Sequence, residues 1–107
     1  MSRRDNMAVE EAIGTALMLV IDPELGENIV DLGLVYEIQY AGAGKARVVM
    51  TTTTRGCPAT DYLVNAAEAA ASSVEEVIQV IVDLTYLPPW SPEMMQPMLK
   101  QHFGIEG

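Results

Sequence analysis

The alternation of apolar residues between positions 34 and 50 is the feature that most constrains this fold. Side chains on one face of a β-strand recur at every second residue, and apolar residues do so here on both sides of a short glycine-containing turn, AGAG at 41–44. The apolar face comprises Leu34, Tyr36, Ile38 and Tyr40 before the turn and Ala46, Val48 and Met50 after it. The sequence therefore predicts an antiparallel β-hairpin, in which the start of one strand lies beside the end of the other.

Helical spacing flanks this hairpin on both sides. A first amphipathic helix is predicted from a cap at Asp5 or Asn6 until Pro23 ends it, and a second follows Cys57. The apolar face of the first comprises Val9, Ala12, Ile13, Ala16, Leu17 and Val20, and that of the second Ala59, Tyr62, Leu63, Ala66, Ala67 and Ala70. The pattern predicts helices that cover the sheet.

The segment Val77–Tyr86 is predicted to be a third strand, apolar enough to be central in the sheet or covered. A crossover through the preceding helix makes this strand parallel to the second hairpin strand. A last helix follows Ser91 and Pro92, and Pro97 should kink it or delay its start. We expect a single domain, residues 1–107, of α+β class: a two-layer α/β sandwich in the order α-β-β-α-β-α, with a mixed sheet of about three strands.

This connectivity brings three loops to one end of the sheet. The acid loop, residues 21–34, ends where the first strand starts, and the cysteine loop, residues 50–58, continues from the second strand. The third loop, residues 87–95, follows the strand that is parallel to the second. We therefore expect these three loops to meet.

Charge and cysteine content exclude several functional classes. The net charge is −9, with 15 acidic against 6 basic residues, so phosphate backbones and anionic lipid surfaces are repelled. RNA binding through a KH-like arrangement is disfavoured further, because a G-x-x-G loop is missing. No apolar run reaches the length of a membrane span or resembles a signal peptide, so we expect a cytoplasmic protein. A single cysteine excludes an internal disulfide and any C-x-x-C zinc pair.

That single cysteine, Cys57, follows four threonines in the stretch MTTTTRGCP. If Pro58 is the first helical residue, Cys57 lies at or next to the helix N-cap. The helix dipole, assisted by Arg55, should then lower the pKa of the thiol and favour the thiolate, which binds metals and attacks electrophiles. The alternative is a small buried apolar residue or a plain cap.

Charged and aromatic residues of the other loops leave two interpretations open. The carboxylates of the acid loop, which are Asp22, Glu24, Glu27 and Asp31, are either solvated or held in fixed positions by the apolar residues between them. Trp90 is either a packed anchor of the third loop or a ring that binds a ligand. His102, in the last helix, is expected to interact with the helix dipole and not to bind metal.

Three segments of the chain, DPELGENIVDLGLVYEI, VVMTTTTRGCPATDYL and VDLTYLPPWSPEMM, together resemble the MIP18 family, also called DUF59. That family includes SufT-like iron-sulfur assembly factors and a PaaD-like subgroup linked to phenylacetate degradation. The resemblance implies a small two-layer α/β fold and a role in building or delivering iron-sulfur clusters. It also implies cofactor-binding residues, which are Asp22, Glu24, Thr53, Thr54 and Cys57. Two residues depart from the family pattern: Arg55 stands where many relatives have proline, and Leu87 where an acidic residue or asparagine is common.

The resulting hypothesis is an assembly or delivery factor, not an enzyme, with no catalytic residues. Cys57 would bind iron or a cluster transiently, as the metal ligand of this chain, and pass it to client apoproteins. One thiolate cannot complete the ligation usual for iron-sulfur clusters, so a homodimer, a client, a small thiol or carboxylates must supply the rest.

Two alternatives remain. One is an adaptor that binds iron-sulfur assembly proteins or a phenylacetate-degradation oxygenase through the methionine-rich end, Met94, Met95 and Met98, and holds no metal. The other is an enzyme with Cys57 as nucleophile, which lacks a histidine base nearby in the sequence.

Overall fold

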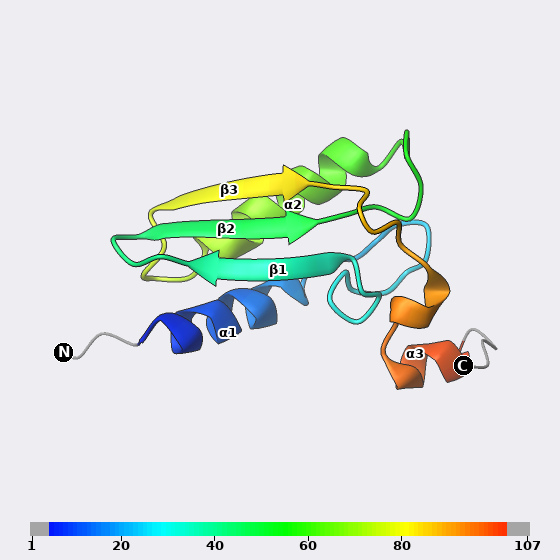
Figure 1. Ribbon diagram of the computed structural model, residues 1–107, viewed down its shortest axis with the longest axis horizontal. Helices are drawn as coiled ribbons and strands as arrows, with labels where there is room; N and C mark the ends of the chain where they lie inside the picture. Colours follow the sequence, from blue (N-terminus) through cyan, green and yellow to red (C-terminus); the bar gives the residue numbers. More distant parts are fainter. Residues whose placement is uncertain (1–4, 103–107) are drawn as a thin grey trace.

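The computed structural model describes residues 5–102 of the chain and has the predicted element order (Figure 1). Its helices and strands are α1 (Asn6–Leu17), β1 (Val35–Tyr40), β2 (Lys45–Met50), α2 (Thr60–Ser72), β3 (Gln79–Leu84), the 3-10 helix η1 (Pro92–Met94) and α3 (Pro97–His102). The Asp5 carboxylate caps α1 by accepting a hydrogen bond from the Ala8 backbone N–H at 2.8 Å, as the sequence predicts. Pro97 delays α3, which begins at that residue.

The sheet has the order β1-β2-β3, with β1 antiparallel and β3 parallel to the central strand β2. The predicted hairpin and the predicted parallel crossover are therefore both confirmed. Figure 1 shows the three-stranded sheet with the ends of β2 and β3 beside the start of β1, and with η1 and α3 beyond that end. None of the helices within residues 5–102 combines the length and the apolar character needed to cross a membrane.

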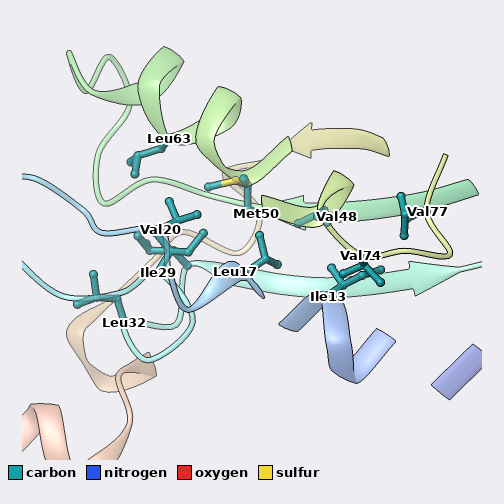
Figure 2. Close-up of a cluster of buried hydrophobic side chains, with 14 of the residues drawn as sticks. Ile13, Leu17, Val20, Ile29, Leu32, Val48, Met50, Leu63, Val74 and Val77 are labelled. Atoms are coloured by element: carbon teal, nitrogen blue, oxygen red, sulfur yellow. The ribbon is translucent and has the colours of Figure 1, made fainter. Parts of the chain in front are cut away.

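The core lies between one face of this sheet and the helices α1 and α2 (Figure 2). Apolar side chains of both helices meet those of the sheet and of the acid loop there. The members with no exposed surface are Val9, Ile13, Leu17, Ile29, Leu32, Leu34, Val48, Met50, Leu63, Ala67 and Ala71. Burying a large apolar side chain stabilises a protein by about 1.5–3 kcal/mol, so this layer holds the helices on the sheet.

The strands differ from the predicted pattern in two respects. A β-bulge between Val35 and Glu37 inserts Tyr36, which joins Glu37 in lining a hollow instead of sharing a face with Ile38. The third strand, β3, is an edge strand and not central, and Ile81 is 51% exposed on the face that the helices leave open. Period-two alternation cannot predict a bulge, because the extra residue leaves no mark in the apolar pattern on either side.

The same end of the sheet gathers the three loops, as predicted. The Cys57 thiol meets the acid loop, and the Trp90 indole Nε1 donates a hydrogen bond to the Leu32 carbonyl oxygen at 2.7 Å. The Thr52 and Tyr86 hydroxyls lie 2.8 Å apart and join the cysteine loop to the residue directly before the third loop. Side-chain hydrogen bonds thus connect the acid loop with both of the other loops.

Candidate functional site

The cysteine loop continues directly from the central strand. Thr51 and Thr52 are buried, and the Thr51 N–H donates to the Leu34 carbonyl oxygen at 2.8 Å, which extends the pairing with the first hairpin strand. Gly56 has φ +71°, a conformation that glycine adopts without strain, and the chain turns there toward Cys57. The turn places Cys57 inward, where it is 6% exposed.

The helix after Cys57 begins later than the sequence predicts. Its first helical residue is Thr60 and its N-cap is Ala59, so Pro58 is not at the first helical position. Instead, the Cys57 carbonyl oxygen accepts hydrogen bonds from the Thr60 N–H at 3.0 Å and the Thr60 hydroxyl at 2.7 Å. This extra turn separates Cys57 from the helix end and weakens the dipole contribution that was expected to favour the thiolate.

A buried carboxylate organises the acid loop. Asp22 is 1% exposed, and its Oδ1 accepts hydrogen bonds from the backbone N–H of Glu24 at 2.8 Å and of Leu25 at 3.1 Å. Its other oxygen, Oδ2, is buried and has no hydrogen-bond partner within residues 5–102. An unpaired buried oxygen of a carboxylate is costly, so this atom is one to which a cation or a donor would bind favourably.

The Cys57 thiol donates a hydrogen bond to Glu24, with Sγ 2.9 Å from Oε1. This bond, then burial, and the negative charges of Glu24 and Asp22 raise the pKa of the Cys57 thiol, and the Ala59 backbone N–H opposes them. The predicted lowering of this pKa was therefore wrong. The two carboxylates of the acid loop affect the pKa of Cys57 more than the helix end does. Cys57 is therefore a neutral thiol that is hydrogen-bonded to a carboxylate oxygen.

The threonines of the cysteine loop lie in two different environments. The Thr52 hydroxyl donates to the Thr54 carbonyl oxygen at 2.7 Å, and it therefore accepts from the Tyr86 hydroxyl. Thr53 is half-buried, Thr54 is exposed, and both line a cavity between the cysteine loop and the third loop. Thr52 and Tyr86 were not predicted as site residues. The parallel crossover, which brings the end of β3 beside the end of β2, was the available signal for this pair.

The other candidate residues lie apart from Cys57 or are used elsewhere. The Asp31 carboxylate accepts from the Asn28 side-chain amide at 2.9 Å, and the Asp31 carbonyl accepts from the Gln96 N–H. Asp83 pairs with Arg47 on the open face of the sheet, beside a hollow of about 720 Å³ that contains none of the predicted site residues. The side chain of His102 lies outside the described residues. Within the part of the chain that the structure describes, no three His, Cys, Asp or Glu side chains are grouped to hold a metal ion.

Fold and site together define a class: a small α+β protein with one buried thiol, held by carboxylates where three loops meet. Residues 10–82 match the model of a family described as iron-sulfur cluster assembly protein. The chain belongs to this family, and the predicted resemblance is confirmed.

Relatives of known name and structure agree with this assignment. The chain is 37% identical over 99 residues to the Fe-S protein maturation auxiliary factor YitW of Bacillus subtilis, covering 92% of this chain and 97% of the relative. It is 34% identical over 97 residues to a putative 1,2-phenylacetyl-CoA epoxidase component of Escherichia coli, covering 89% of this chain and 57% of that component. A DUF59 domain from Bacillus anthracis superposes with a TM-score of 0.88 at 39% identity, covering 94% of this chain and 96% of that one.

Proposed function

We propose that the chain acts in iron-sulfur cluster assembly as a non-enzymatic factor that binds iron or a cluster transiently and passes it to client proteins. Family membership and the name of the Bacillus subtilis relative support the general role. The observation that carries the specific role is the pairing of a buried thiol with a carboxylate at 2.9 Å, next to a second carboxylate with a free buried oxygen.

In this proposal Cys57 is the sulfur ligand of the cargo, and Glu24 accepts the thiol proton when the metal binds. The proton has a route out, because Glu24 is exposed whereas Cys57 is buried. Asp22 can supply a further oxygen ligand through Oδ2, which has no hydrogen-bond partner within residues 5–102. A neutral thiol in the unloaded state suits a transient carrier, because the metal must displace a proton and is correspondingly easier to release.

The cargo needs ligands beyond those of one chain. Iron-sulfur clusters are held mainly by cysteine thiolates, and this chain has one cysteine. Thr53 and Thr54 offer hydroxyls at the mouth of the loop, which suit hydrogen bonds to sulfur better than ligation of iron. We propose that a second copy of the chain, or the client, supplies the remaining thiolates, so that loading favours a homodimer.

Anaerobic reconstitution with iron and sulfide tests the role of Cys57. The wild type is expected to develop visible absorption and bound iron, and Cys57→Ser is expected to lose both and to fail to support client maturation in cells. Glu68→Gln, which removes an exposed carboxylate from α2, is the control and should load as the wild type does. Retention of cluster and client maturation by Cys57→Ser would show that this assignment is wrong.

An adaptor that holds no metal is the second candidate. It is favoured by the lack of a three-ligand group within residues 5–102 and by the exposure of Met98, 81%, near the half-buried Leu99 in α3. Its partners would be iron-sulfur assembly proteins or an oxygenase complex. Pull-down with wild type and Cys57→Ala separates the two candidates, because an adaptor keeps its partners when the thiol is removed. That residues 1–107 form a single domain and that the protein is cytoplasmic both stay predictions.

A further inference from the structure

The third loop and the cysteine loop border a cavity of about 320 Å³ that is open to solvent beside the exposed Arg55 and Leu87. This volume is at the lower end of the range for small-molecule sites. Neither Cys57 nor the carboxylates bonded around it line the cavity, although Thr53 and Thr54 do. The cavity therefore shares Thr53 and Thr54, but neither the thiol nor its carboxylates, with the proposed metal site.

One side of the cavity is polar and cationic. Arg55 lines it with its guanidinium 4.8 Å from the centroid of the Tyr86 ring, a cation–π contact that holds the group in place. No carboxylate of residues 5–102 forms an ion pair with Arg55. Its N–H donors therefore remain available in a chain whose net charge of −9 otherwise repels anions.

The polar partners around Arg55 are fixed before any ligand arrives. The Tyr86 hydroxyl is bonded to the buried Thr52 hydroxyl at 2.8 Å, which sets the position of the ring under the guanidinium. The hydroxyls of Thr53 and Thr54 line the same cavity and can rotate to donate to an oxygen of a ligand. This side of the cavity offers donors to an acceptor group.

Apolar side chains line the other side of the cavity. Leu87, Pro89 and Trp90 form an apolar wall, and the Trp90 ring is fixed by the hydrogen bond from Nε1 to the Leu32 carbonyl oxygen at 2.7 Å. A rigid indole and a proline ring favour a flat apolar body over a fully hydrated ion.

We propose that this cavity binds a small organic carboxylate, with the carboxylate on Arg55 and a flat apolar body against Trp90. A guanidinium presents parallel donors that match the two oxygens of a carboxylate. A single cation in so acidic a chain suits a ligand with one negative charge better than a doubly charged phosphate.

Benzoate tests the proposal, because Trp90 is the only tryptophan and its fluorescence reports on the cavity directly. Titration of the metal-free protein with benzoate is expected to change Trp90 fluorescence saturably. Benzamide, the neutral counterpart, and inorganic phosphate should each bind at least about tenfold more weakly. Arg55→Gln is expected to weaken benzoate binding by about tenfold or more, since a charged hydrogen-bonding partner is lost.

The matched control is Lys45→Gln, which removes one exposed positive charge at the hairpin end of β2. It should leave benzoate affinity unchanged. The proposal is wrong if benzoate and benzamide bind with equal affinity or if phosphate binds more tightly than benzoate. It is also wrong if Arg55→Gln and Lys45→Gln weaken benzoate binding to the same extent. Because no metal is present, failure here leaves the role of Cys57 untouched, and failure of cluster loading leaves this site untouched.

Discussion

Replacing Gly33 by alanine tests how firmly the acid loop holds the third loop and η1. Gly33 has φ +78°, and an added Cβ would lie 2.4 Å from the Met94 backbone carbonyl oxygen. A backbone atom cannot move aside as a flexible side chain can, so the two segments must separate. The substitution therefore acts on the contact between two loops that are far apart in the sequence.

The expected loss of stability can be estimated from the interactions that break when the two segments move apart. A left-handed conformation costs a non-glycine residue about 1–2 kcal/mol. Separation also breaks the hydrogen bond from the Gln96 N–H to the Asp31 carbonyl, 2.8 Å long, which is worth about 0.5–1.5 kcal/mol. Met95, 5% exposed, loses part of its burial, which adds about 1–2 kcal/mol. We expect Gly33→Ala to lower the free energy of unfolding by about 2.5–5.5 kcal/mol.

Urea unfolding followed by circular dichroism measures this change, and Gly26→Ala is the matched control. Gly26 has nearly the same φ, +73°, but nothing lies within 4 Å of an added Cβ. The control should therefore lose only the conformational term, about 1–2 kcal/mol. If the two variants unfolded at the same urea concentration, the contact with Met94 would not constrain the fold and this reasoning would be refuted.

Three further predictions concern the thiol, the third loop and the core. Glu24→Gln removes the largest cause that raises the pKa of Cys57, so the rate of alkylation by iodoacetamide should rise at lower pH than in the wild type. Trp90→Phe keeps a ring but loses the bond to the Leu32 carbonyl, and urea unfolding should show a loss of about 1 kcal/mol. Ile13→Ala leaves a cavity in the fully buried layer, and the same assay should show a loss of about 2–5 kcal/mol.

Each of these has a control. Glu68→Gln should leave the alkylation profile unchanged, and a shift of the Glu24→Gln profile toward higher pH would contradict the cause given for the raised pKa. For the third loop, Leu87→Ala removes a side chain that is 78% exposed and should change stability little. For the core, Met7→Ala, at a position 73% exposed on the same helix as Ile13, should also be close to neutral.

Local patterns were sufficient to predict the elements and their connectivity. Apolar alternation predicted the hairpin, and helical spacing together with Asp5 predicted the first helix and its cap. The convergence of three loops followed from one antiparallel and one parallel pairing, without any knowledge of side-chain contacts. These features depend on short stretches of chain, so a single sequence contains the information that they require.

Features that depend on distant residues could not be predicted. The pKa of Cys57 is set mainly by Glu24, which the sequence places in another loop, and so the helix end alone gave the wrong sign. The bulge at Tyr36 and the edge position of β3 depend on pairing partners, not on apolar pattern. The hydrogen bond between Thr52 and Tyr86 could not be predicted, because the sequence does not distinguish the four consecutive threonines from one another.

The sequence separations within the loop cluster also dictate the order in which the protein folds. The hairpin closes over a short turn, whereas Glu24 and Cys57 are 33 positions apart and Leu32 and Trp90 are 58 apart. Closing longer segments costs more conformational entropy, so long-range contacts form after local ones. The loop cluster is therefore assembled last. The Cys57 thiol therefore gains its hydrogen bond to Glu24, and with it the raised pKa, only after the hairpin has formed.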